Sequence, residues 1–151
     1  MIRIGAILPE LKTRVKVTTD TSAIDKAISL CDDNLSEVKD ILNDIKSTIE
    51  EGAEGVADKA SEGLKSYQEL WIIQNKTIDT GQMIDTLFIE PSGQNKYGVG
   101  PTALSEYGFP YPLVIEMGSV KYEGKPFVKP ALDNMVSDIE QYVQVEIINK
   151  L

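Results

Sequence analysis

The apolar residues between Ile24 and Ile49 constrain the fold more than any other part of the chain. They alternate at spacings of four and three residues through Ile24, Ile28, Cys31, Leu35, Val38, Leu42, Ile45 and Ile49. This heptad spacing places all of them on one face of an α-helix. Ser22, followed three residues later by Asp25, has the pattern of a helix N-terminus. The sequence therefore predicts a long helix that begins near Ser22 and carries one narrow apolar stripe.

A second helical pattern follows after two glycines. Its apolar positions are Ala53, Val56, Ala60, Leu64, Tyr67 and Trp71. Gly52 and Gly55 each cost a helix interior about 1 kcal/mol relative to alanine. We therefore expect residues 21–74 to be helical, with a bend or a break near these glycines.

Alternation with a period of two predicts the strands. Residues 1–20 alternate around Ile2 and Ile4 and again around Val15 and Val17, which is typical of an extended arm or of edge strands.

Residues 77–125 are expected to form sheet and loops. The stretches 83–90 and 96–100 predict a β-hairpin with its turn at residues 91–93, and the Gly-Val-Gly-Pro run at 98–101 is typical of a strand end. The Gly-, Pro- and Tyr-rich stretch 101–112 predicts a loop.

A turn at 118–124 is expected to lead into a C-terminal helix over 127–149, opened near Pro126 or Pro130. Its predicted apolar face is Leu132, Val136, Ile139, Val143 and Ile147. Together these elements predict a single α+β domain spanning residues 1–151, with the helices packed on a small antiparallel sheet.

The charge is negative and unevenly distributed. The net charge is −9, and residues 20–62 alone carry twelve acids against four lysines, a net of −8. Such a surface repels phosphate backbones, so we expect no tight nucleic-acid binding. No apolar run approaches the roughly 20 residues of a membrane span, and no signal-peptide pattern opens the chain, so we expect synthesis in a cytoplasm and no membrane partner.

The residue types exclude much of catalytic chemistry. The chain has no histidine, which removes the commonest general base and metal ligand. Cys31 falls in the heptad stripe, and we expect it to be a small buried side chain. The neighbouring pairs Asp32-Asp33 and Glu50-Glu51 point to different sides of a helix and are expected to be solvated. We predict no catalytic residue, cofactor or metal.

Asp79-Thr80-Gly81 is the one triplet with a catalytic precedent. Asp-Thr-Gly carries the catalytic carboxylate of aspartic proteases, and a dimer could bring two such acids together. The polar residues 75–77 before it lack the apolar strand that such a loop follows. We expect an Asx-type turn in which Gly81 has a positive φ, and keep the dimeric protease as a remote alternative.

Aromatic residues gather in the predicted sheet and loops, at Tyr97, Tyr107, Phe109, Tyr111 and Tyr122. Aromatic side chains are enriched in the cores of protein interfaces. Tyr107, Phe109 and Tyr111 are therefore candidate interface residues, although burial within the chain itself explains them equally well.

Four short segments between residues 79 and 132 occur in a recognisable order. Thr80-Gly81 begins the first and Gly100-Pro101 ends the second. The third is Tyr111-Pro112-Leu113-Val114-Ile115-Glu116-Met117-Gly118-Ser119, and the fourth is Pro126-Phe127-Val128-Lys129-Pro130-Ala131-Leu132. The series resembles a family of bacteriophage head-tail joining or tail-completion proteins. Gln82, Met117 and the insertion at 103–109 depart from that family's pattern.

The resemblance implies an α+β structural protein with no cofactor, located in the virion of a phage or prophage and made in the host cytoplasm. It implies assembly into a homo-oligomeric ring, with six copies expected and twelve left open, and contacts with neighbouring neck or tail proteins. The residues it marks are Thr80, Gly81, Gly100, Pro101, Glu116, Gly118, Pro126, Phe127 and Pro130. The heptads alone support an alternative, a bacterial coiled-coil adaptor in which residues 22–50 pair with a partner helix.

Overall fold

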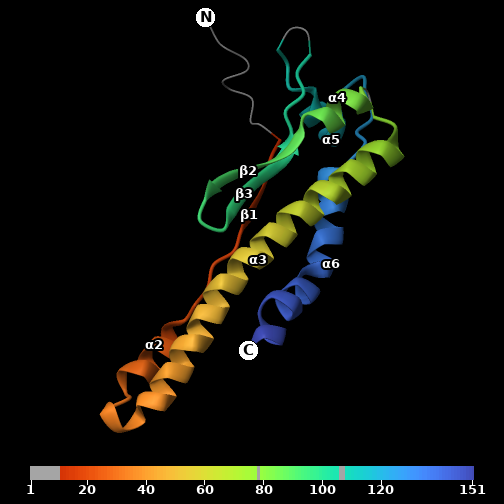
Figure 1. Ribbon diagram of the computed structural model, residues 1–151. Helices are drawn as coiled ribbons and strands as arrows, with labels where there is room; N and C mark the ends of the chain where they lie inside the picture. The colour runs from red at the N-terminus through yellow and green to blue at the C-terminus, as the bar shows by residue number, and fades with distance from the viewer. Residues whose placement is uncertain (1–10, 78, 106–107) are drawn as a thin grey trace, which may run out of the picture.

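A computed structural model describes residues 11–77, 79–105 and 108–151 (Figure 1). The elements in chain order are β1 (Thr13–Lys16), α2 (Ser22–Ser29), a 3₁₀ turn (Asp33–Leu35), α3 (Ser36–Asn75), α4 (Thr80–Asp85), β2 (Leu87–Gly93), β3 (Lys96–Pro101), α5 (Tyr111–Met117), α6 (Val128–Glu146) and a second 3₁₀ turn (Ile148–Lys150). The predicted α+β class is confirmed. The alternation at Ile2 and Ile4 lies outside the described residues.

The three strands form one antiparallel sheet in the order β1-β3-β2. Val15 of β1 lies opposite Tyr97 of β3, and Ile89 of β2 lies opposite Val99. The strands predicted around Val15 and over 96–100 are therefore confirmed. Because β3 is central, β1 and β2 form the two edges of the sheet that the described residues make.

The strand predicted over 83–90 is wrong in its first half, where the chain forms α4. Met83 and Leu87 are both buried. Along a strand, Asp85 would share their face and enter the core. As a helix, α4 keeps Asp85 exposed while Met83 stays buried.

The predicted turn at 91–93 is also wrong, because β2 continues through Gly93 with an irregular register between Pro91 and Gly93. The hairpin turns at Gln94 and Asn95, and Asn95 takes the positive φ of 52° that a tight turn requires. A proline is tolerated in β2 because this is an edge strand.

No break occurs at Gly52 or Gly55, and α3 continues from Ser36 to Asn75 as one helix. A β-carbon on Gly52 would lie 2.4 Å from Cγ1 of Ile147 and 2.7 Å from the backbone oxygen of Glu146. Glycine is therefore required here by the close approach of the chain end that follows α6. That packing outweighs the cost of about 1 kcal/mol that glycine imposes on a helix.

The long helix predicted from Ser22 to Ile49 is interrupted. α2 ends at Ser29, and the carboxylate of Asp32 accepts the backbone N–H of Asn34 at 3.0 Å, which starts a 3₁₀ turn. Short polar side chains compete in this way with helical hydrogen bonds. The chain then reverses, so that α2 packs against the first half of α3 (Figure 1). Cys31 lies in this reversal and is only half-buried.

The hydrophobic core lies where the second half of α3 meets the sheet, α5 and α6. Its most deeply buried large side chains are Leu64, Ile72, Met83, Val99, Ile115 and Phe127. The face predicted for α6 is partly wrong, because Ala131 and Met135 are buried while Val136 and Ile139 are 54% and 37% exposed. The small residues of α3 allow α6 to pack closely against it. The face of α6 that this packing buries differs from the face that its apolar residues predict.

Candidate assembly surfaces

The motif residues of α5 and α6 meet at one corner of the fold. The Glu116 carboxylate accepts the backbone N–H of Phe127 at 2.6 Å, of Val128 at 2.9 Å and of Lys129 at 3.1 Å. Pro130 has no N–H to satisfy. Ala131 begins the helical pattern by donating to the backbone oxygen of Phe127 at 3.3 Å. Every donor at the start of α6 is thereby satisfied, and the negative charge lies at the positive end of the helix.

Two glycines form the turn that brings Glu116 to α6. Gly118 has a φ of 79°, and a β-carbon on it would lie 2.8 Å from the backbone nitrogen of Gly124. The bridge between Ser119 and Tyr122 confirms the predicted turn at 118–124. Asn75, at the end of α3, donates to the backbone oxygen of Pro126 at 2.8 Å. Glu116, Gly118, Pro126 and Phe127 therefore belong to one structural unit.

The other motif residues lie on α4 and at the end of β3. The hydroxyl of Thr80 donates to the backbone oxygen of Thr77 at 2.7 Å, whereas a β-carbon on Gly81 would meet no heavy atom within 4 Å. A β-carbon on Gly100 would lie 2.1 Å from the backbone oxygen of Leu11, and Pro101 is buried. Gly100 is thus required by close packing, while Gly81 is not.

The Asx-turn prediction at Asp79 is wrong in its geometry. Asp79 itself takes the left-handed conformation, with φ 50°, and precedes α4, whereas Gly81 lies inside that helix. Asp79 is exposed. The described ranges contain no cluster of three or more side chains that could hold a metal ion.

Three of the five aromatic candidates pack within the chain itself. Tyr97, Tyr111 and Tyr122 pack against the core. The hydroxyl of Tyr111 donates to Oε1 of Gln82 at 2.9 Å, and burial, with the nearby charge of Asp79, raises the pKa of Tyr111. Phe109 is half-buried, and Tyr107 lies outside the described residues.

A polar ladder between α3 and α6 was not predicted. Its polar pairs are Lys59 with Glu146, Tyr67 with Asp138, and Trp71 with Asn134, and the hydroxyl of Tyr142 packs against Gly63 at the same spacing of four along each helix. The matched spacing of four in two distant segments was the only sequence signal for it.

The ladder fixes how α6 lies on α3. Trp71 Nε1 donates to Asn134 Oδ1 at 2.9 Å, and the hydroxyl of Tyr67 donates to the carboxylate of Asp138. This hydrogen bond raises the pKa of Tyr67. Lys59 and Lys150 hydrogen-bond to Glu146 and lower its pKa.

Comparison of the chain with protein-family models, curated proteins and solved structures found no match in any of the three. None of the helices in the described ranges has the length and apolar content needed to cross a bilayer. The surfaces of the molecule are therefore the guide to its function.

The first of these surfaces is the end of the α2–α3 hairpin. We call residues 30–41 the hairpin tip. Four of its large apolar side chains are exposed: Leu30 (75%), Leu35 (44%), Val38 (45%) and Ile41 (58%). No side chain between Thr21 and Glu51 is fully buried, so this part of the hairpin projects from the core (Figure 1).

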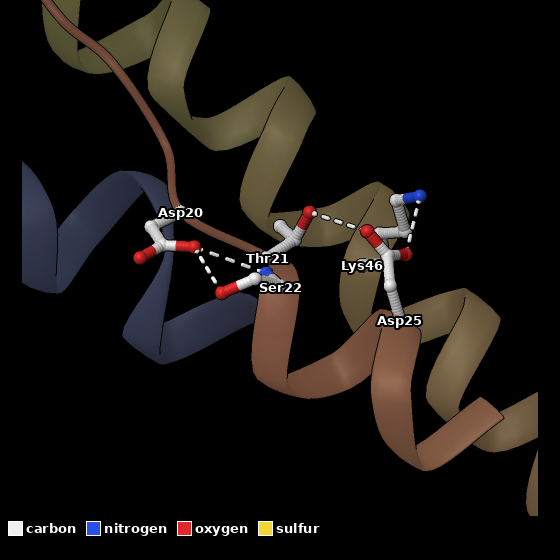
Figure 2. Close-up of polar contacts among 5 residues, drawn as sticks. All are labelled: Asp20, Thr21, Ser22, Asp25 and Lys46. Atoms are coloured by element: carbon white, nitrogen blue, oxygen red, sulfur yellow. Dashed lines mark hydrogen bonds and ion pairs between the residues drawn. The ribbon is translucent and has the colours of Figure 1, made fainter. Parts of the chain in front are cut away.

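Polar contacts hold the base of the hairpin together. Figure 2 shows Lys46 of α3 reaching Asp25 of α2, with 2.7 Å between Nζ and Oδ1. The carboxylate of Asp20 accepts the backbone N–H of Ser22 at 3.0 Å and its hydroxyl at 2.6 Å, which lowers the pKa of Asp20 (Figure 2). The ion pair between Lys46 and Asp25 holds α2 against α3, and the Asp20 carboxylate binds the first residue of α2. The side chains of the tip stay exposed.

The second surface is a groove that we call the β1–α6 groove. It has a volume of about 410 Å³ and is lined by residues 14–18, Val56, Ala60, Met135, Ile139 and Val143. Its floor is apolar, and its edge is formed by the β1 segment, whose basic residues Arg14 and Lys16 are exposed. Five consecutive residues of the β1 segment line it, so the groove runs along the β1 edge of the sheet.

Proposed function

We propose that this protein is a structural subunit of a bacteriophage or prophage virion, located at the head-tail connection or at the tail end. It is made in the host cytoplasm and acts by assembling with copies of itself into a ring that contacts neighbouring neck or tail proteins.

The observation that carries the proposal is the corner formed by Glu116, Gly118, Pro126 and Phe127. In the sequence these are separate pieces of a motif series that resembles head-tail joining proteins. In the fold they act together, because the glycine turn brings the Glu116 carboxylate to the start of α6. A series whose members depend on one another in this way is stronger support for the resemblance than four unrelated matches.

The exposed surfaces also favour assembly. Leu30 and Ile41 at the hairpin tip are more than half exposed, and apolar patches of this kind mark interaction sites. The acidic hairpin carries most of the net charge of −9 and would be repelled by DNA passing through a ring.

The coiled-coil adaptor is less well supported. Its basis was one continuous apolar stripe over 22–50, and the chain reversal at residues 30–35 divides that stripe between α2 and α3. α2 already packs on α3, so the stripe is partly covered within the chain.

The test is the absolute mass of the purified protein, measured by light scattering across a concentration series. A ring-sized mass, or a monomer that reaches one as concentration rises, supports the proposal, and association with neck or tail proteins would extend it. A protein that stays monomeric at high concentration and binds no virion protein would contradict it. A stable dimer would favour the coiled-coil adaptor instead.

A further inference from the structure

We propose that the hairpin tip of one copy docks in the β1–α6 groove of the next copy and that this contact builds the ring. The inference rests on the proposed function, since it names the two surfaces through which the copies would join.

The groove offers basic and apolar contacts together. Residues 12–18 include Lys12, Arg14 and Lys16 and no acid. Arg14 and Lys16 are exposed and form no ion pair within the described part of the chain. The apolar floor at Met135, Ile139 and Val143 can take side chains from a partner.

The edge of β1 adds two hydrogen-bond donors. The backbone N–H of Val17 bonds to the backbone oxygen of Asn95 at 3.0 Å, so Val15 and Val17 direct their main-chain groups toward β3. In an antiparallel ladder the alternate residues, here Arg14 and Lys16, direct theirs away from it. An acidic side chain at the β1 edge of the groove would meet these two outward N–H groups, with the cationic side chains of Arg14 and Lys16 beside it on the face of β1 opposite the buried Val15.

The hairpin tip has the complementary composition. Residues 30–41 carry four carboxylates (Asp32, Asp33, Glu37 and Asp40) against one lysine, Lys39, all of them exposed. In the sequence these acids lie between Leu30 and Ile41, the two most exposed apolar side chains of the tip. An acidic and apolar surface matches a basic and apolar groove, and such complementarity selects the partner and its orientation.

The tip cannot fill the groove of its own chain. Val56 and Ala60 of the groove belong to α3, the same unbroken helix that carries Val38 of the tip. Val56 lies 18 positions after Val38, so the helix holds the two surfaces about 27 Å apart along its axis. Contact between two different surfaces of identical chains is heterologous, and it closes into a ring where the rotation between copies allows it.

The experiment uses charge reversal in the full chain. The groove variant is Arg14→Glu with Lys16→Glu, and the tip variant is Asp33→Lys with Asp40→Lys. Lys121→Glu with Lys125→Glu is the control. It makes the same charge change as the groove variant, at exposed positions of the α5–α6 turn. Circular dichroism and the unfolding midpoint establish that each variant is folded.

We expect each of the two variants alone to require at least tenfold higher concentration than wild type for assembly, while the control assembles as wild type does. Mixing the two variants in equal amounts restores assembly, because every contact in an alternating ring again joins opposite charges. If the groove variant fails to fold, the tip variant compared with wild type still decides the question.

The contact is overturned if wild type assembles and the tip variant assembles equally well, and ring assembly then stands without it. Loss of assembly in the groove variant with no rescue by the tip variant would also overturn it and point to another occupant, such as a strand added to β1. A wild-type protein that is monomeric at every concentration would overturn the contact, and it would contradict the proposed function itself if it also bound no virion protein.

Discussion

Oε2 of Glu116 lies 2.6 Å from the backbone nitrogen of Phe127, so a carboxylate on α5 caps a helix that begins twelve residues later. A cap supplied from another helix ties the start of α6 to the end of α5. The buried ring of Phe127 and the capped backbone are thereby fixed as one unit, and this corner positions the helix that covers α3.

Replacing Glu116 by glutamine should lower the free energy of unfolding by about 1 kcal/mol, the typical contribution of a helix cap. Glutamine keeps one acceptor oxygen but loses the charge and the second acceptor. Urea denaturation measures the change, with Glu123→Gln as a control because Glu123 is exposed in the adjacent turn. Equal midpoints for the two variants would contradict the capping role.

Gly52→Ala and Gly81→Ala should change stability in opposite directions, although both glycines lie in helices. The alanine methyl at position 52 would clash with Ile147 and with the backbone of Glu146, and overpacking of this kind costs about 1–3 kcal/mol. At position 81 nothing lies within 4 Å, so alanine should gain up to about 1 kcal/mol from helix propensity. Chemical denaturation of both variants gives the answer, and a stabilised Gly52→Ala would refute the close contact.

The hydrogen bond from Tyr67 to Asp138 should make stability fall in alkaline solution. It raises the pKa of Tyr67 above the ordinary value of 10.0. A group with a raised folded-state pKa contributes stability that is complete below its unfolded pKa and is lost as pH rises through its folded pKa. As the pH rises above about 10, wild type should therefore lose more stability than Tyr67→Phe.

Asp138→Asn tests the cause of that shift. It removes the charged acceptor, so the pKa of Tyr67, followed by tyrosinate absorbance, should return toward its ordinary value. Glu140→Gln serves as the control, because Glu140 is an exposed acid on the same helix. An alkaline titration that is identical in all three proteins would contradict the effect of Asp138.

Hydrogen exchange should separate the two halves of α3. No side chain is fully buried between Thr21 and Glu51, whereas Ala53, Ala57, Ala60 and Leu64 are almost completely buried. Amides of the hairpin tip should therefore exchange faster than those of residues 53–64, measured by mass spectrometry at low protein concentration. Equal protection in both halves of a monomeric sample would show that the tip is covered from within the chain.

The sequence located most helices and strands, and its errors have physical causes. The heptad spacing predicted one continuous helix from Ile24 to Ile49, but the break between α2 and α3 depends on the local hydrogen bond between Asp32 and Asn34. At Met83 and Leu87, a spacing of four fits a helix and a strand alike, and only the position of Asp85 distinguishes them.

The local sequence patterns could not predict the long-range contacts of the fold. Gly52 carries a local cost in a helix, and the compensating contact with Ile147 comes from the far end of the chain. The role of Glu116 was also not predictable, because the motif includes this residue without showing which backbone N–H groups donate hydrogen bonds to it. Cys31, expected to be buried, lies at a chain reversal that was not predicted.

The unbroken course of α3 makes the hairpin a lever whose pivot is the contact between Gly52 and Ile147. From Ser36 to Gly52 the helix extends about 24 Å beyond that pivot, so a tilt of roughly 10° moves its outer end by about 4 Å. The close packing at Gly52, which leaves no room for a methyl group, thus sets the direction in which the tip is presented. In a closed ring, small errors in this direction would add from one copy to the next, so the packing of one glycine would help to set the ring's diameter.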